Sequence, residues 1–322
     1  MKRKTRWWWG CLTAGLLLAA AVAGGSLYLL DYALSPENRG KDVEGSVRYM
    51  RQTYPWIEPW MDSLRSVQAL RDTFIMAPDG LRLHALYAAA QQPTARTAVM
   101  VHGYTDNAVR MLHIGYLYHR KLGFNILLPD LRYSGLSEGN AFQMGWLDRI
   151  DVEQWIKVAP TLFGDSLQMV VHGISMGAAT TLMLSGDSLP AHVRCLVEDC
   201  GYTSVWDQFE KELKEQFSLP AFPLLHTASL FCQWKNGWNF HEASALRQVA
   251  KCRLPMLFIH GDADDFVPTQ MVYPLYEAKP APKELWIVPG AAHARSYGSF
   301  PEEYTERVAR FVIPTLQMED AK

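Results

Sequence analysis

The sequence predicts an α/β protein whose mostly parallel sheet is covered by helices on both faces. Strand-like and helix-like segments alternate along most of the chain. The strand-like segments are continuous apolar runs, which is typical of strands buried on both faces. The polar residues of chemical interest follow the carboxyl ends of these strands, where open parallel sheets bind their ligands.

The expected sheet begins with a hairpin. Its strands, Thr73–Met76 and Leu81–Ala89, are separated by the turn signal Pro78-Asp79-Gly80. Six further strands are expected at Ala98–Val101, Phe124–Leu128, Leu167–Val171, Val193–Val197, Met256–Ile259 and Leu285–Val288. The helices expected around them are Val109–Lys121, Trp146–Leu162, Ala178–Leu184 and Glu303–Leu316. These segments predict a mostly parallel, eight-stranded sheet.

The N-terminus has the pattern of a membrane anchor. Four basic residues lie within the first six positions, three tryptophans follow, and Gly10 to Leu30 carries no charge. A helix of that length spans roughly 30 Å, the hydrocarbon thickness of a bilayer. Basic residues stay on the cytoplasmic side and tryptophans favour the interface. The pattern predicts a single-pass anchor in the cell membrane, with the remaining chain on the extracytoplasmic side.

A cleaved signal peptide is the alternative to an anchor. Ala21-Val22-Ala23 has the form of a cleavage site, and cleavage near Ala23 predicts a secreted protein. The apolar run continues to Leu30, which favours the anchor. We therefore expect an anchor over residues 1–30, a connector over 31–70, and a sheet domain over 71–322.

Composition limits the functional classes. The 322 residues allow a large core, and a net charge of −2 gives no reason to expect a nucleic-acid partner. Five cysteines are too few for a disulfide framework in a chain of this length. Cys232 and Cys252 as a pair, or all of Cys195, Cys200, Cys232 and Cys252 as buried free thiols, both remain open. The cysteines have no metal-ligand spacing, and we expect no metal ion or cofactor.

A long insertion separates the Val193 strand from the Met256 strand. It exceeds a usual connection by roughly 50 residues and has helical patterns at Val205–Phe217 and Pro223–Trp234. We expect a lid over residues 201–253. The lid is rich in aromatic residues: Trp206, Phe209, Phe217, Phe222, Phe231, Trp234, Trp238 and Phe240. Most should pack the lid onto the core, and a few should line an apolar substrate pocket.

One strand ends in the pattern Gly-x-Ser-x-Gly. Residues Met169 to Val171 are followed by Gly173-Ile174-Ser175-Met176-Gly177 and then by a helical segment. This strand, turn and helix form the context of a nucleophile elbow. The sharp turn predicts a strained backbone at the serine, and the glycines allow strand and helix to approach closely. The helix start favours a developing oxyanion.

A serine nucleophile needs an imidazole base and a carboxylate that orients it. In this arrangement the chain order is serine, acid, histidine. Among the ten histidines, His293 has the required order and lies just after the last strand. Asp262, Asp264 and Asp265 all follow the preceding strand, so the spacing leaves the acid open. His172 and His260 are expected to be structural. The backbone N–H groups of Met176 and Tyr104 are the expected oxyanion donors.

The motifs resemble those of the α/β-hydrolase superfamily over about residues 71–316. They are His102-Gly103-Tyr104, Pro129-Asp130-Leu131-Arg132 with Gly135 and Ser137-Glu138-Gly139, Met144-Gly145-Trp146, His172 to Gly177, His260 to Pro268, and His293. Within the superfamily the chain is similar to membrane-anchored bacterial cell-surface hydrolases of the serine aminopeptidase-like and esterase-like group. The superfamily pattern His-Gly-x-x-Asp-x-x-Val-Pro implies that Asp264 is the acid. One departure is Tyr133-Ser134-Gly135, where relatives often carry Gly-His-Gly, and this loop is expected to alter the pocket.

The predicted function is a serine hydrolase that uses Ser175, Asp264 and His293 to form an acyl-enzyme. Carboxyl esters with apolar acyl or aryl groups are the expected substrates, because the lid is aromatic. Peptidase, thioesterase or acyltransferase chemistry uses the same residues. A non-catalytic binding protein at the cell surface is the alternative from another class, and dehalogenase chemistry requires an aspartate where Ser175 stands. The oligomeric state stays open.

Overall fold

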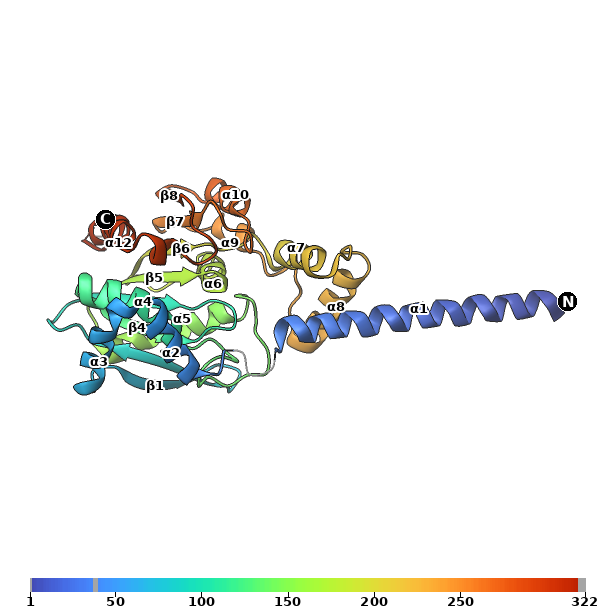
Figure 1. Ribbon diagram of the computed structural model, residues 1–322, viewed down its shortest axis with the longest axis horizontal. Helices are drawn as coiled ribbons and strands as arrows, with labels where there is room; N and C mark the ends of the chain where they lie inside the picture. Colours follow the sequence, from blue (N-terminus) through green and yellow to red (C-terminus); the bar gives the residue numbers. More distant parts are fainter. Residues whose placement is uncertain (1, 37–39, 318–322) are drawn as a thin grey trace.

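An eight-stranded sheet forms the centre of the computed structural model, which describes residues 2–36 and 40–317 (Figure 1). The strand order is β1-β2-β4-β3-β5-β6-β7-β8. The strands are β1 Arg71–Met76, β2 Arg82–Ala88, β3 Arg96–Val101, β4 Asn125–Pro129, β5 Gln168–Ile174, β6 Val193–Asp199, β7 Met256–Gly261 and β8 Lys283–Val288. β2 pairs antiparallel with β1 and β4, and all other pairs are parallel. The expected hairpin and the mostly parallel sheet are confirmed.

Two hydrophobic cores cover the two faces of the sheet. In β3, Val99 and Val101 belong to one core, whereas Ala98 and Met100 belong to the other. Such alternation between two buried faces explains why the strands are apolar throughout. The first core contains residues of α5 Asp148–Phe163, α6 Met176–Leu184, α9 Ala245–Val249 and α10 Val272–Ala278. The second contains residues of α2 Val43–Thr53, α3 Glu58–Ser66, α4 Leu112–Gly115 and α12 Pro301–Gln317.

Some helical segments differ from expectation. The helix expected at Val109–Lys121 divides into η2 Ala108–Met111, α4 and the π-helical η3 Tyr116–Lys121. The connector over residues 31–70, the lead-in to the sheet, contains α2, which was not expected. The Asp42 side chain caps this helix by accepting a hydrogen bond from the Gly45 N–H at 2.7 Å. Further short helices are η1 Pro55–Ile57, η4 Thr269–Met271 and α11 Ser296–Ser299. The lead-in is therefore part of the folded domain.

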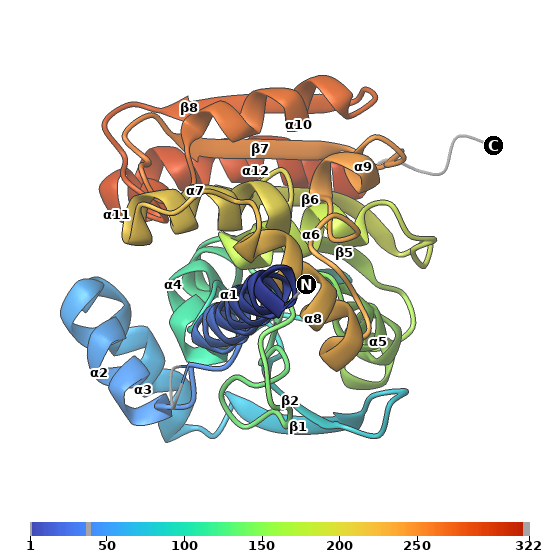
Figure 2. The same cartoon turned by 90° about the vertical axis from the view of Figure 1, so that its right-hand side faces the viewer.

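The insertion contains α9 and two longer helices, α7 Val205–Phe217 and α8 Leu224–Asn236. These two lie beside the long N-terminal helix α1 Lys2–Leu34. α1 projects from the side of the domain that carries these two helices (Figures 1 and 2). Among the described residues, it is the one helix long and apolar enough to cross a membrane, and a signal sequence meets the same criterion. The helix continues past Leu30 to Leu34.

The cysteines are free. Cys195, Cys200, Cys232 and Cys252 are buried, and Cys11 on α1 is exposed. Of the two states that the sequence leaves open, the structure has buried thiols. Burial raises the pKa of the Cys232 thiol to about 12, which keeps it protonated at neutral pH.

Candidate active site

Ser175 lies in a sharp turn between β5 and α6. Its φ of 58° and ψ of −120° belong to a backbone region that residues with a side chain rarely adopt. Two hydrogen bonds hold the turn, from the Ser175 N–H to the Asp199 carbonyl at 2.8 Å and from the Ala179 N–H to the Ser175 carbonyl at 2.9 Å. The strain that the sequence predicts at this serine is present, and it directs the residue to the carboxyl edge of the sheet.

The two glycines of the motif are required by close packing of the backbone. A Cβ on Gly173 would lie 2.0 Å from the Gly177 carbonyl oxygen, and a Cβ on Gly177 would lie 2.0 Å from the Val101 carbonyl oxygen. Neither contact is sterically feasible, so any side chain at these positions would displace α6 from the sheet. This agrees with the role expected for them from the sequence.

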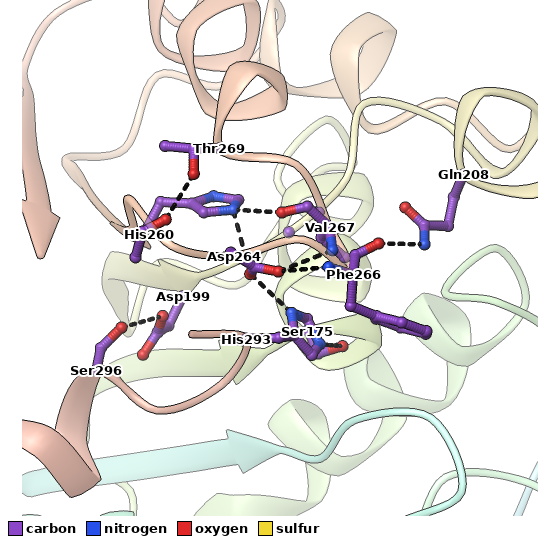
Figure 3. A network of polar contacts seen from close by, with 12 residues as sticks. Ser175, Asp199, Gln208, His260, Asp264, Phe266, Val267, Thr269, His293 and Ser296 are labelled. Carbon is purple, nitrogen blue, oxygen red and sulfur yellow. Dashed lines mark hydrogen bonds and ion pairs between the residues drawn. The ribbon is translucent and has the colours of Figure 1, made fainter. Parts of the chain in front are cut away.

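The structure brings Ser175, His293 and Asp264 together from three loops at the same sheet edge (Figure 3). The Ser175 Oγ and His293 Nε2 are 2.8 Å apart. The His293 Nδ1 and the Asp264 Oδ2 are also 2.8 Å apart. This is the geometry that proton transfer from the hydroxyl to the imidazole requires.

Asp264 is buried and well supplied with donors. Its Oδ1 accepts hydrogen bonds from the Phe266 N–H at 3.1 Å and the Val267 N–H at 2.9 Å. Burial raises the pKa of Asp264, but hydrogen bonds to His260 and His293 outweigh this and lower it to about 2. The carboxylate is therefore ionised throughout the neutral range and can stabilise a positive charge on His293.

The two histidines expected to be structural are buried in hydrogen-bond networks. The His260 Nε2 lies 2.9 Å from the Val267 carbonyl oxygen and 3.4 Å from the Asp264 Oδ2, on the other side of that carboxylate from His293 (Figure 3). His172 lies between the hydroxyls of Tyr118 and Tyr304, at 3.1 and 2.9 Å. Burial lowers the pKa of His172 to about 3, so it stays neutral. Neither ring contacts Ser175.

Two backbone segments border Ser175 where an oxyanion would form. Met176 is the first residue of α6, and the first N–H groups of a helix have no partner within the helix. The loop after β3 passes beside the nucleophile, since a Cβ on Gly103 would lie 3.4 Å from the Ser175 Cβ. Tyr104 follows in this loop, and its hydroxyl donates to the Ala33 carbonyl of α1 at 2.6 Å. His102 joins this loop to the loop after β4, because its Nδ1 lies 2.8 Å from the Gly103 carbonyl oxygen and its Nε2 accepts a hydrogen bond from the Leu131 N–H at 2.9 Å.

Sequence reasoning missed a pair of carboxyl groups at the end of β6, behind the nucleophile. Asp199 accepts hydrogen bonds from Ser296 at 3.1 Å and Tyr304 at 3.0 Å, and burial raises its pKa to about 6. Glu198 accepts from the Gly201 N–H at 3.0 Å, and burial raises its pKa to about 8. Two acidic residues that end a buried strand were the signal available in the sequence.

Two cavities meet at His293. The larger, about 470 Å³, lies between Ser175 and the lid. Its apolar wall includes Phe209, Phe217, Leu225, Ala228 and Phe240 of the lid and Leu29, Leu30 and Ala33 of α1. The smaller, about 190 Å³, is lined by polar residues that include Tyr49, Tyr54, Arg110, His113 and Arg295. The loop at Tyr133, where the sequence differs from the pattern of relatives, was expected to alter the pocket. Tyr133 lines neither cavity and packs against Phe142 instead.

One group of side chains has atoms close enough to share a metal ion. The ligand atoms of Cys200, Asp264 and His293 lie within 4.8 Å of one another. Burial raises the pKa of the Cys200 thiol well above its usual range, so the sulfur is protonated and a poor ligand. Asp264 and His293 already form a hydrogen bond with each other. This group therefore suits proton transfer better than metal binding.

Comparisons with known proteins identify the family and the fold of the chain. The sequence model of the prolyl oligopeptidase family matches residues 116–319. The protein YqkD of Bacillus subtilis is 30% identical over 226 residues, which cover 70% of this chain and 74% of YqkD. The esterase Pf2001 of Pyrococcus furiosus superposes with a TM-score of 0.63 at 22% identity, covering 79% of this chain and 95% of that one. The Pyrococcus horikoshii acylaminoacyl peptidase superposes with a TM-score of 0.58 at 18% identity, over 79% of this chain and 42% of the peptidase. Both are similar in fold.

Proposed function

This chain belongs to the prolyl oligopeptidase family of α/β-hydrolases, and from that premise we propose that it is a serine hydrolase that forms an acyl-enzyme on Ser175. The observation that carries the proposal is the pair of 2.8 Å contacts joining Ser175 to His293 and His293 to Asp264. A strained serine between two cavities gives a substrate access to the nucleophile.

In the proposed first step, the Ser175 Oγ attacks the substrate carbonyl while the His293 Nε2 takes the hydroxyl proton. Asp264 orients His293 and stabilises its positive charge. The N–H groups of Met176 and Tyr104 stabilise the oxyanion, each by about 3 kcal/mol in the transition state. His293 then donates its proton to the leaving group, and the acyl group remains on Ser175. A water molecule activated by His293 releases it as an acid.

We propose carboxyl esters with an apolar acyl or aryl group as the substrates. The large apolar cavity bordered by Ser175 supports this choice, because it suits an alkyl or aryl group better than a peptide side chain of mixed polarity. The smaller polar cavity lies where a leaving group would depart. The residues proposed for catalysis also serve peptidase, thioesterase and acyltransferase reactions, so the experiment must compare ester, amide and thioester bonds.

The test has two parts. A fluorophosphonate probe should label the protein, and Ser175→Ala should abolish the labelling while the thermal unfolding profile stays intact. Panels of esters, amides and thioesters matched in their acyl group then identify the preferred bond. Absence of labelling in well-folded protein would instead support a non-catalytic binding protein. A preference for amides over esters would contradict the proposed substrate class and leave the nucleophile in place.

We also propose that α1 is a single-pass anchor and that the domain lies outside the cytoplasm. The uncharged helix and the basic residues that precede it support this orientation. The test is N-terminal sequencing of mature protein from cells. A mature sequence that begins at Gly24 would contradict the anchor and support secretion after cleavage.

A further inference from the structure

We propose that the lid helix α8 lies in the outer interface of the bilayer and that the apolar cavity receives its acyl ester substrate from the bilayer. The substrate class is a membrane-resident amphiphile, in which a long acyl chain is esterified to a polar group. This inference rests on the proposed serine hydrolase function. It also requires that α1 stays attached as a membrane span.

The two halves of α1 have different surroundings. Every described side chain from Trp7 to Ala21 is exposed. Beyond this point, Ser26, Leu30 and Leu34 are buried at four-residue spacing, which places them on one helix face. That face packs on the domain, with the Ser26 hydroxyl donating to the Leu224 carbonyl of α8 at 3.0 Å. The second half of α1 is therefore part of the domain.

The length of the span places α8 at the membrane. About 20 residues are needed to cross roughly 30 Å of hydrocarbon. Counted from Gly10, which follows the interfacial tryptophans, they end at Leu29, about one helical turn beyond Ser26. Ser26 contacts the start of α8. A span of normal length therefore brings the start of α8 to the outer boundary of the hydrocarbon.

The contacts of α8 also indicate that it runs obliquely to α1 and close to the membrane plane. Its first residue, Leu224, is bonded to Ser26, whereas Lys235 near its end pairs with Asp31 at 3.7 Å. These two positions on α1 are separated by five residues, a rise of about 7 to 8 Å. The corresponding length along α8 is about 16 Å. A helix at this depth that is inclined toward the membrane plane and exposes large apolar side chains suits interfacial binding.

The outward face of α8 carries large apolar side chains without a protein partner to cover them. Phe222, just before the helix, is 72% exposed, Leu230 is 70% exposed and Trp234 is 83% exposed. The same helix also exposes the polar His226, Gln233 and Lys235. In α7 the exposed side chains include the charged Glu210, Lys214 and Glu215 but no aromatic residue. Aromatic residues favour the bilayer interface, and clusters of exposed apolar residues mark interaction sites. Continuity with the span of α1 identifies the bilayer as the occupant.

The same two helices form one wall of the apolar cavity. Leu29 and Ala33 of α1 and Leu225 and Ala228 of α8 line it, and Ser175 borders it. An acyl chain that leaves the bilayer along α1 therefore enters apolar surroundings without crossing bulk water. The volume of the apolar cavity, about 470 Å³, lies within the range of cavities that bind small molecules.

The first test measures depth with the full chain in phosphatidylcholine vesicles. In a Cys11→Ala background, Leu230→Cys is labelled with an environment-sensitive fluorophore, since the remaining cysteines are buried. We expect a nitroxide on the lipid acyl chain to quench this label and aqueous iodide to leave it largely unaffected. Glu210→Cys on α7 is the matched control, with the opposite result expected. Equal iodide quenching at both positions would overturn the proposal.

The second test measures delivery of substrate. Leu230→Asp combined with Trp234→Asp changes residues that line neither cavity. We expect turnover of a long-chain ester in vesicles to fall about tenfold or more, because the interfacial contact is lost. Turnover of a short-chain soluble ester should stay within about twofold of the wild type. Equal loss on both substrates would overturn bilayer delivery. If the wild type hydrolyses neither, the proposed function fails, and the depth measurement still decides the position of α8.

Discussion

The two cavities beside His293 differ in size, polarity and origin. The apolar cavity of about 470 Å³ is formed largely by the lid insertion and the end of α1. The polar cavity of about 190 Å³ is formed by the lead-in around Tyr49 and Tyr54 and by the loop of Arg295. Both include Gly103, Ile174 and His293, so they meet at the reacting atoms. The parts of the chain outside the sheet thus form the walls that differ between the two cavities.

The charges in the polar cavity come from few groups. Burial lowers the pKa of His113 to about 3 and raises the pKa of Tyr54 to about 12, so both are neutral at pH 7. Arg110 pairs with Asp106 at 2.8 Å, whereas Arg295 is exposed and adds a positive charge. Because the two cavities differ in polarity and charge, the site can orient a substrate by the polarity of its two ends. In the proposed reaction, the acyl group would enter the apolar cavity, and a polar or anionic leaving group would face Arg295.

The largest effect is expected from a change of Asp264, because it contacts His293, which borders both cavities. Asp264→Asn should lower kcat by about 10⁴-fold for every ester, because the amide supports the wrong tautomer of His293. Steady-state kinetics on long-chain and short-chain esters measures this. Asp265→Asn changes an exposed neighbour and is the matched control. Loss on one substrate class alone would show that the two cavities do not share one catalytic centre.

Changes in the apolar cavity should alter acyl-chain preference. In Ala33→Phe the new side chain extends from the α1 wall into the cavity. It should lower kcat/KM for long acyl chains by about 10- to 100-fold, with a smaller effect on acetyl esters. Leu29→Ala shortens a side chain of the same wall, which enlarges the cavity and should shift the preference toward longer acyl chains. Both are measured on an ester series with one leaving group. Parallel changes at all chain lengths would assign the acyl group to another site.

The polar cavity should affect the leaving group. Arg295→Gln removes a positive charge and should lower kcat/KM for anionic leaving groups about fivefold relative to neutral ones, with a smaller difference at high salt. The experiment uses one acyl group with a charged and a neutral leaving group. If the ratio is unchanged, Arg295 has no part in orientation.

Glu198 lies behind both cavities, so Glu198→Gln should leave the preferences for acyl chain and for leaving group unchanged. Burial raises the pKa of Glu198 from 4.5 to about 8, so the folded state keeps a proton that the unfolded state releases. The free energy of unfolding of the wild type should therefore decrease as pH rises from about 4.5 to 8. The Glu198→Gln variant should lack this contribution and gain on the order of 2 kcal/mol relative to the wild type at pH 8. Denaturant unfolding at several pH values measures the difference, and parallel pH profiles would contradict the assignment.

Local patterns were sufficient for much of the fold and for the nucleophile. Apolar runs and the hairpin pattern placed all eight strands within a few residues. The central strands were predictable because they are buried on both faces, which requires consecutive apolar side chains. Gly173, Ser175 and Gly177 form one short motif, so the elbow was predictable. The broken helix from Ala108 to Lys121 was not, since its 3₁₀ and π turns depend on packing against the sheet.

The choice among three aspartates shows where local information ends. Asp262, Asp264 and Asp265 have nearly the same position relative to β7, and a family resemblance was needed to choose one. In the part of the chain that the structure describes, Asp264 is the one of the three that lies within hydrogen-bond distance of His293. Which carboxylate reaches the imidazole depends on how two loops from different strands meet.

The sequence by itself determined the strand order along the chain, the sharp turn at Ser175, the position of His293 after the last strand and an apolar N-terminal helix. Each depends on residues close together in the chain. Only the tertiary structure decided that the last turns of α1 line the cavity beside Ser175, and that α8 packs against α1 with Leu230 and Trp234 exposed. These features join segments about 200 residues apart, such as Ser26 and Leu224. Contacts between such distant segments arise from packing of complete elements, which no local pattern encodes.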